Sequence, residues 1–307
     1  MLSREEWENT FRGVYQGETE FGFPMKDCTS LAIGGPADVM VSPDDPLSMR
    51  NLIVVLSKKG IPYITLGGGT NMLVSDNGIE GVVLSLKTFR RIEVLKEGNK
   101  EVELFVEAGV TLQRLVNFCK ERGYSGIEGL TGIPGTVGGA ICGNAGSFDC
   151  EIKDVLDSVA IMDSKGRLDR FKAAGLGFGY RKSDISDDDI VLSANMRLKR
   201  DEKDAVALRT DNFFREKKRN QPISERSAGC VFKNPEGMSA GRLIDEAGCK
   251  GMRRGGIEVS TLHANFFVNS GGGTAADYID LMNEVSSAVH KKFAVLLQPE
   301  IKVAGKV

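Results

Sequence analysis

Two glycine-rich segments are places where the backbone could hold an anion. The shorter one is Gly67, Gly68, Gly69, Thr70 and Asn71, which directly follow an apolar segment expected to be a strand. Adjacent glycines allow positive φ angles and let successive N–H groups converge on a phosphate, while Thr70 and Asn71 offer further polar contacts. A tight turn is the alternative, although three adjacent glycines are more than a turn requires. The segment therefore favours a phosphate cradle and leaves the turn open.

The longer glycine-rich segment runs from residue 126 to residue 146. So many glycines cannot form a packed helix or strand without a cost in free energy. A close approach of the backbone to a large planar or phosphorylated ligand explains them better than a purely structural Ω-loop, which stays the alternative. The P-loop motif GxxxxGK[ST] is absent from the sequence. The near match to a Rossmann fingerprint at residues 271–276 lacks an acidic residue about 20 positions later and favours a helix-starting loop.

Three further side chains could take part in chemistry, although each also has an ordinary explanation. Cys230 follows Gly229, so a turn would aim its thiol into a cleft, but a cysteine with apolar neighbours is usually inert core. If Cys230 is chemically active, an acid is favoured over a nucleophile. Arg181 could bind a carboxylate or phosphate bidentately, or it is a surface arginine. Glu300 would by itself be a solvated carboxylate.

The composition excludes several classes of protein. The chain has 307 residues, which suggests about two domains, and its formal net charge is −2. A pI near 5.9 without a basic excess argues against nucleic-acid binding. Six cysteines without a CxxC pair, and only two histidines, argue against a metal site and for reduced thiols. No signal peptide and no apolar run long enough to span a bilayer is evident, so we expect a cytoplasmic protein without membrane insertion.

Hydrophobic periodicity and capping residues predict the elements that position these segments. Strands are expected at 37–41, 61–66, 82–86, 102–107, 155–162, 167–171, 190–198, 263–268 and 297–303. Helices are expected at 47–59, 112–122, 212–220, 240–247 and 274–291. The polar run at 199–209 is the best candidate boundary. This layout predicts an α/β or α+β domain to about residue 200, followed by a smaller α+β domain.

Taken together, these segments resemble the UDP-N-acetylenolpyruvoylglucosamine reductases, a family of flavoenzymes that make UDP-N-acetylmuramate for bacterial peptidoglycan. The matching segments follow in the family's order and are Leu31–Ala37, Leu66–Asn71, Glu128–Gly146, Tyr180–Ser183, Cys230–Pro235 and Gln298–Glu300. The short interval between Arg181 and Cys230 resembles the subfamily that lacks a tyrosine-bearing loop over the substrate. The chain departs from many members at residues 147–150, which concerns the detail of that loop rather than flavin binding.

The resemblance implies an α+β fold with a two-lobed FAD-binding domain of the p-cresol methylhydroxylase type and a smaller α+β substrate-binding domain. The implied ranges are 1–20 for an N-terminal helical segment, 21–200 for the FAD-binding domain and 201–307 for the substrate-binding domain. By this analogy FAD is bound non-covalently. Its contacts would be Gly67, Gly68, Gly69, Thr70, Asn71, Gly132, Ile133, Pro134, Gly135, Thr136, Gly138, Gly139, Asn144, Ala145 and Gly146.

The resemblance also implies a mechanism in which FAD, reduced by NADPH, gives a hydride to the terminal carbon of the substrate's enolpyruvyl double bond. Negative charge then develops on the neighbouring carbon and its carboxylate, where Arg181 and a neutral Glu300 would stabilise it. Cys230 would protonate that carbon, a role for which some members use serine; a thiol is the stronger acid. Substrate contacts would include Tyr180, Lys218, Arg219 and Asn234, with the choice between Lys218 and Arg219 for the pyrophosphate left open.

Two other functions remain as alternatives. An oxidase of the same flavin fold, acting on an alcohol or a sugar, would need neither an acid such as Cys230 nor a basic helix that contacts a pyrophosphate. A catalytically silent nucleotide-sugar binding protein would not need Arg181, Cys230 and Glu300 together.

Overall fold

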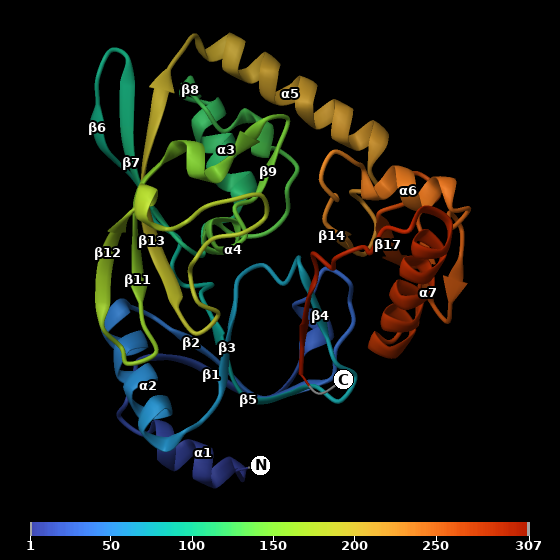
Figure 1. Cartoon of the computed structure of the whole chain (residues 1–307). Coiled ribbons are helices and arrows are strands. Elements are labelled where there is room, and N and C mark those ends of the chain that lie inside the picture. The colour runs from blue at the N-terminus through green and yellow to red at the C-terminus, as the bar shows by residue number, and fades with distance from the viewer. Residues whose placement is uncertain (1, 306–307) are drawn as a thin grey trace. The chain divides into compact units, whose positions relative to one another are not determined.

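The computed structural model describes residues 2–305 and divides the chain into two compact units, each assembled from several segments (Figure 1). The first unit consists of Met1–Gly22, Asp38–Gly68 and Glu80–Arg215, and the second of Phe23–Ala37, Gly69–Ile79 and Glu216–Val307. Both units mix helices and strands, as expected for an α+β protein. The three domain ranges expected from the sequence stay a prediction.

The first unit begins with a small sheet and the helices beside it. Its elements are α1 (Arg4–Phe11), β1 (Gly17–Pro24), β2 (Pro36–Pro43), α2 (Pro46–Lys59), β3 (Tyr63–Leu66) and β5 (Ile79–Ser85). The strand order is β1-β2-β5-β3, and β3 runs parallel to β5. The side chain of Asp45 caps the start of α2, and Gly60 ends the helix at a φ of 63°. The strand and helix predicted from residue 37 to residue 59 are confirmed.

A larger sheet forms the rest of the first unit's framework. It contains β6 (Ile92–Glu97), β7 (Glu101–Glu107), β8 (Tyr124–Ser125), β11 (Leu156–Met162), β12 (Leu168–Lys172) and β13 (Ile190–Arg200). The order is β12-β11-β13-β7-β6, and β8 also pairs with β13. The predicted hairpin is confirmed as β11 and β12. The strand β6 was not predicted, because it is largely exposed and lacks an alternating apolar pattern.

Short elements between β7 and β11 carry the longer glycine-rich segment. They are α3 (Leu112–Lys120), the 3₁₀ turn η2 (Glu128–Leu130), α4 (Val137–Cys142), β9 (Gly146–Ser147), β10 (Cys150–Glu151) and the 3₁₀ turn η3 (Ile152–Val155). A further 3₁₀ turn, η4 (Ala173–Gly175), follows β12. Glycine did not prevent a helix here: α4 forms within the segment because Thr136 caps it and the apolar side chains of Val137 and Ile141 are buried.

Residues 199–209, the expected domain boundary, are not a loop but the end of a strand and the start of a helix. The strand β13 continues to Arg200, and the helix α5 (Lys203–Asn220) starts three residues later, well before the predicted residue 212. Residues 203–209 are mostly strong helix formers, and Val206 supplies a buried anchor that is 1% exposed. A polar composition was therefore the mark of an exposed helix face rather than of a loop.

The second unit is built around one antiparallel sheet and one long helix. Its elements are the 3₁₀ turn η1 (Met25–Asp27), β4 (Met72–Val74), β14 (Ser227–Cys230), α6 (Ala240–Glu246), β15 (Arg253–Arg254), β16 (Ile257–Val259), β17 (Phe266–Asn269), α7 (Ala275–Phe293) and β18 (Lys302–Ala304). The sheet order is β14-β17-β16-β15, while β18 pairs in parallel with β4. Phe267, Tyr278 and Leu281 lie in its core.

The closing strand predicted at 297–303 is confirmed only near its end. Residues 298–300 run beside residues 231–233, where Lys233 N donates to Gln298 O over 2.8 Å and Glu300 N donates to Val231 O over 2.7 Å. Pro299 has no N–H, so a regular ladder is interrupted there and the strand β18 begins at Lys302. The predicted helices at 240–247 and 274–291 are confirmed as α6 and α7.

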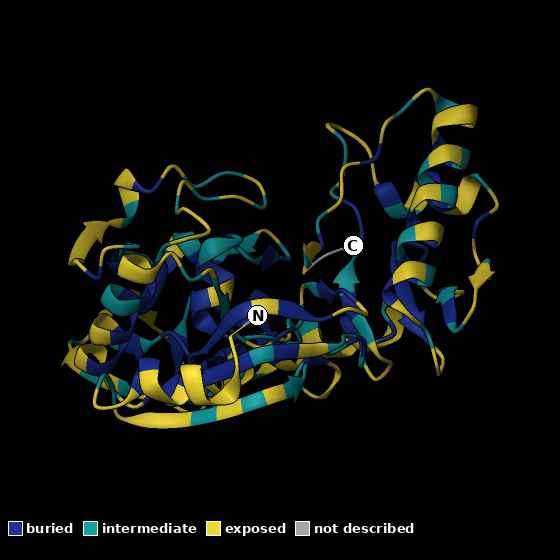
Figure 2. Ribbon diagram, turned by 90° about the horizontal axis from the view of Figure 1, so that it is seen from below, coloured by how far each residue is buried: buried dark blue, intermediate teal, exposed yellow. Residues whose placement is uncertain are grey.

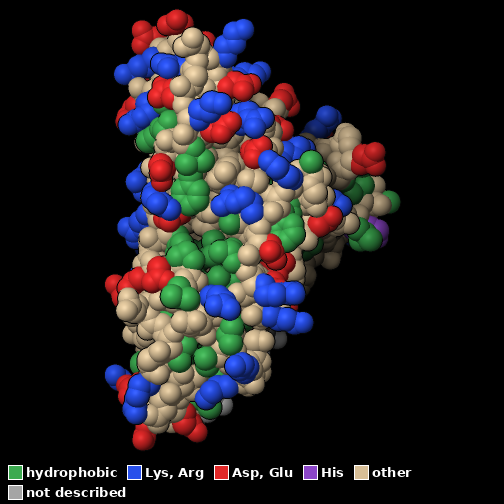
Figure 3. Space-filling view, turned by 90° about the vertical axis from the view of Figure 1, so that its left-hand side faces the viewer, with side chains coloured by type: hydrophobic (Ala, Val, Ile, Leu, Met, Phe, Trp, Pro, Cys, Tyr) green, Lys and Arg blue, Asp and Glu red, His purple; other side chains and the backbone are tan. Residues whose placement is uncertain are grey.

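Burial and charge follow the usual pattern of a globular protein. The helices of both units are exposed along one side, while interior strands are mostly buried (Figure 2). On the face shown in Figure 3, Lys and Arg side chains are interspersed with Asp and Glu, in keeping with the net charge of −2. Within residues 2–305 no helix is long and apolar enough to cross a membrane.

Candidate functional site

The two glycine-rich segments meet inside the first unit. A Cβ atom added at Gly67 would lie 2.6 Å from Oγ1 of Thr136, the residue that caps α4. The Gly139 N–H donates to the same Oγ1 over 3.5 Å. Segments about 70 residues apart in sequence, both expected to contact FAD, therefore also contact each other directly.

Several of the glycines are crowded by other parts of the protein. A Cβ at Gly138 would lie 2.9 Å from Cβ of Ala108, and the Gly138 N–H donates to Ala108 O over 2.9 Å. In the second unit, Gly69 has a φ of 61°, and a Cβ there would lie 2.0 Å from Cys28 O. Position 69 therefore requires a glycine, because its backbone passes close to another backbone.

Two other glycines have no such explanation. Apart from its own helix backbone and chain neighbours, a Cβ at Gly139 would come no closer than 3.7 Å, to Oγ1 of Thr136, and a Cβ at Gly143 would lie 3.6 Å from Gly139 O. Both distances are ordinary van der Waals contacts, and neither residue has a positive φ. Gly139 lies inside α4, where a glycine costs about 1 kcal/mol relative to alanine, whereas Gly143 is the C-cap of that helix. The protein's own packing therefore does not explain why these two positions are glycine.

The side chain of Arg181 is hydrogen-bonded to the end of the longer glycine-rich segment. Its Nη2 donates to Gly146 O over 2.7 Å, and its guanidinium carbon lies 5.2 Å from the centre of the Tyr180 ring. The completely buried Asn144 donates from Nδ2 to Gly179 O over 2.9 Å, so the two segments are joined twice. The structure thus brings together Arg181, Tyr180, Asn144 and Gly146, all within the first unit.

The charge of Arg181 also acts on a neighbouring carboxylate. Partial burial of Glu151 opposes its ionisation. Hydrogen bonds from Lys153 and Asn144 and the charges of Lys153 and Arg181 outweigh that effect, so the pKa of Glu151 lies below its usual value. Glu151 is therefore ionised at neutral pH, and the charge of Arg181 is one of the causes.

The second unit brings Cys230 and Glu300 close together in the backbone. Cys230 ends β14, where it pairs with Phe266, and the next residue, Val231, accepts the hydrogen bond from Glu300 N. Asn71 joins the same place, because its Nδ2 donates to Glu300 O over 3.1 Å. Cys230 and Glu300 are both half-buried. A turn was expected before Cys230, but Gly229 lies within β14, where its φ of 78° accompanies a shift in the register with β17.

The predicted substrate-binding residues have different surroundings. Oδ1 of Asn234 accepts from Ala240 N over 2.9 Å, so this side chain supports the start of α6. Lys218 and Arg219 are exposed on the last turn of α5, whereas Lys217 is only 4% exposed. The burial of Lys217 was not predicted from the sequence. The signal was available in the helical spacing, because Lys217 falls on the same face as the buried Val206 and Thr210.

Family models match both parts of the chain. An FAD binding domain model matches residues 37–172, and the model described as UDP-N-acetylenolpyruvoylglucosamine reductase, C-terminal domain, matches residues 221–304. The fold is α+β, and its FAD-binding domain is of the p-cresol methylhydroxylase type. These features place the chain among the FAD-containing oxidoreductases.

Similar proteins narrow this class to one family. A UDP-N-acetylenolpyruvoylglucosamine reductase of Syntrophus aciditrophicus is 36% identical over 295 residues, covering 96% of this chain and 95% of the relative. One from Geobacter sulfurreducens is 40% identical over 293 residues, with coverages of 94% and 95%. The crystal structure of the Thermus caldophilus reductase is 35% identical, has a TM-score of 0.80 and covers 94% of this chain and 99% of that one. The chain belongs to the UDP-N-acetylenolpyruvoylglucosamine reductase family.

The oxidase alternative has less support. Physcomitrella patens BBE-like 1 is 16% identical with a TM-score of 0.50, and this match covers 63% of the present chain and 44% of that protein. Such a likeness reflects a shared fold alone. The reductase relatives, in contrast, match along nearly the whole chain.

Proposed function

We propose that Arg181, Cys230 and Glu300 carry out the family's reaction in this chain, the reduction of the enolpyruvyl ether of UDP-N-acetylglucosamine to UDP-N-acetylmuramate. This reduction is a step of peptidoglycan precursor synthesis. The enzyme uses FAD, with NADPH as co-substrate, and we place its activity in the cytoplasm. When bound, FAD supplies the hydride for the double bond.

The backbone of residues 67–71 and 132–146 holds the dinucleotide in this proposal. The observation that carries it is the pair Gly139 and Gly143, whose missing side chains no described protein neighbour explains. Gly67 and Thr136 shape the adjoining surface, where any larger residue at position 67 would collide with the threonine hydroxyl. The residues present therefore fit a cofactor that approaches the backbone closely.

Arg181 stabilises the charge that develops on the substrate's carboxylate. Its bond to Gly146 O fixes the guanidinium beside the cofactor-binding backbone before substrate arrives. A donor oriented in advance needs little reorganisation during the reaction, and such donors are typically worth several kcal/mol in the transition state. Tyr180 is half exposed and flanks the guanidinium, which is consistent with a contact to substrate.

Cys230 is the proton donor to the carbon next to the carboxylate. A neutral Glu300 stabilises the charge on that carboxylate together with Arg181. The backbones of Cys230 and Glu300 are fixed by the hydrogen bond from Glu300 N to Val231 O, so the spacing of the thiol and the carboxyl does not depend on long flexible loops. For the UDP moiety, we propose contacts with Asn234, with Lys218 or Arg219, and with the buried Lys217 as an additional candidate.

The cofactor assignment can be tested with Gly139→Ala. The added methyl group meets protein atoms only at ordinary contact distance, and alanine favours the helix by about 1 kcal/mol, so the protein without FAD should unfold at the same or a higher urea concentration. The dissociation constant for FAD, measured by fluorescence titration, should rise at least tenfold. Gly175→Ala is a matched control, since nothing lies within 4 Å of a Cβ there and its φ is not positive.

Two results would contradict the proposal. If Gly139→Ala binds FAD as tightly as the unmodified protein, residues 132–146 do not approach the cofactor. If the FAD-loaded protein oxidises NADPH at the same rate with and without UDP-N-acetylglucosamine enolpyruvate, the proposed substrate is wrong.

A further inference from the structure

The longer glycine-rich segment starts and ends at the same place, because residues 126–129 contact residues 147–150. We call these two short stretches the neck. Ser147 Oγ donates to Gly129 O over 2.5 Å, and Cys150 Sγ donates to Gly126 O over 3.3 Å. A Cβ at Gly129 would lie 2.6 Å from Ser147 O, so the two ends are in direct contact. The backbone from residue 130 to residue 146 is therefore a loop whose shape depends on how this neck is held.

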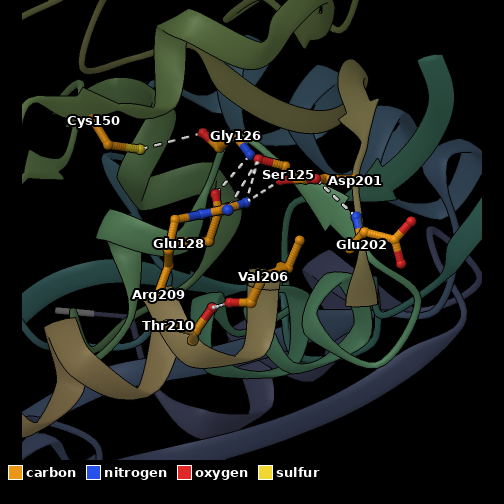
Figure 4. Close-up of polar contacts among 9 residues, drawn as sticks. All are labelled: Ser125, Gly126, Glu128, Cys150, Asp201, Glu202, Val206, Arg209 and Thr210. Carbon is orange, nitrogen blue, oxygen red and sulfur yellow. Dashed lines mark hydrogen bonds and ion pairs between the residues drawn. The ribbon is translucent and has the colours of Figure 1, made fainter. Parts of the chain in front are cut away.

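One arginine of α5 holds the first side of the neck (Figure 4). Arg209 donates from Nε and Nη2 to Oε1 of Glu128, over 3.1 and 2.8 Å, and Glu128 is only 7% exposed. Glu128 also accepts from Ser125 Oγ over 2.8 Å and from Gly126 N over 2.7 Å. A buried carboxylate with all these donors is fixed in one position.

The charge state of this pair is well defined. Burial opposes ionisation of Glu128, but the Gly126 N–H and the Arg209 guanidinium outweigh it and hold the pKa of Glu128 below its usual value. Asp201, placed just before α5, accepts from Arg209 Nη2 over 2.6 Å and orients the guanidinium from its other side (Figure 4). Arg209 thus connects the start of α5 to the turn that opens the glycine-rich segment.

An aromatic residue of the same helix face holds the other side of the neck. Phe213 lies one turn after Arg209, and its ring stacks on that of Phe148 with centroids 4.5 Å apart and planes 18° apart. Phe148 and Asp149 have φ angles of 52° and 54°, which residues other than glycine rarely adopt. A conformation of this kind persists where surrounding contacts impose it, and the Phe213 ring is such a contact.

We propose that Arg209 and Phe213 are positioning residues, which keep the backbone of residues 130–146 in the shape that binds FAD. The inference rests on the proposed cofactor site. It predicts that loosening the neck weakens FAD binding beyond any effect on folding, because the N–H groups of a closed loop need no reorganisation when the ligand arrives.

The test compares Arg209→Met with Arg215→Met. Both replace an arginine of α5, but Arg215 is exposed, and within residues 2–305 its hydrogen bonds stay in its own helix, to Asp211 O and to Asn212 Oδ1. FAD affinity is measured by titration of the apoproteins, and urea unfolding of the same apoproteins measures stability. Arg209→Met should raise the dissociation constant for FAD at least tenfold, and Arg215→Met less than twofold. With saturating FAD, Arg209→Met should reduce its flavin with NADPH at a nearly normal rate.

Phe213→Leu keeps the ion pair intact and provides a second test if Arg209→Met does not fold. It should also raise the dissociation constant for FAD, by at least threefold. FAD affinities within twofold of the unmodified protein in the folded variants would overturn the inference. The proposed cofactor site would survive that result if Gly139→Ala still weakened FAD binding, so the two failures are distinguishable.

Discussion

Replacing Gly69 by alanine should destabilise the second unit far more than the same replacement at Gly272. The two residues have similar φ angles, 61° and 69°, so both variants carry the same left-handed backbone penalty of about 1–2 kcal/mol. They differ in the space around the new methyl group. At Gly272 nothing lies within 4 Å, whereas at Gly69 a Cβ would lie 2.0 Å from Cys28 O and 3.1 Å from Thr29 Cα.

The size of the difference follows from these contacts. Backbone atoms cannot rotate away like a side chain, so the segment at residues 28–30 must move, and forced overpacking typically costs about 1–3 kcal/mol. The movement also strains the hydrogen bond from Ser30 N to Gly69 O, which is 3.0 Å long. Loss of such a bond costs about 0.5–1.5 kcal/mol. We expect Gly69→Ala to be less stable than Gly272→Ala by about 2–4 kcal/mol.

The measurement is urea unfolding of the two apoproteins, followed by circular dichroism. FAD is left out because a bound ligand stabilises the native state and would mask part of the difference. Free energies of unfolding that agree to within about 0.5 kcal/mol would refute the reasoning, since the close approach to Cys28 O would then have no energetic consequence.

Two further predictions concern Glu128 and Cys230. Because the pKa of Glu128 is lower in the folded protein, its ionised form stabilises the fold above the unfolded-state pKa, and this stability is lost as the pH falls. In urea unfolding, Glu128→Gln should be less stable than the unmodified protein by about 1–3 kcal/mol at pH 7 and should approach it near pH 3. A difference in stability that does not change with pH would contradict this. In stopped-flow assays, the flavin of Cys230→Ala should be reduced by NADPH at the normal rate and reoxidised by the enol ether about 10²–10⁴-fold more slowly. Cys230→Ser should keep substantial activity. Replacing the buried Cys249 by alanine should change neither half-reaction. Equal losses in both half-reactions of Cys230→Ala would exclude the proton-donor role.

The sequence by itself determined the family, the α+β class and most of the elements. Residue types carry this information locally: Asp45 and Gly60 mark the ends of α2, and alternating apolar residues mark β7. The matching segments kept their order, so the family could be inferred without any knowledge of how they fold. Local signals failed where an element is exposed, as in β6, or where a polar run is helical, as at the start of α5.

Only the tertiary structure distinguishes the glycines that protein packing requires from those that it does not. Gly69, Gly138 and Gly139 look alike in the sequence, yet Gly69 is required by Cys28 and Gly138 by Ala108, while Gly139 has no crowded protein neighbour. The burial of charged side chains is also decided by the tertiary structure, since Lys217 is buried and its neighbour Lys218 is exposed. Close approach and burial depend on residues distant along the chain, and no local pattern records which of them come together once the chain has folded.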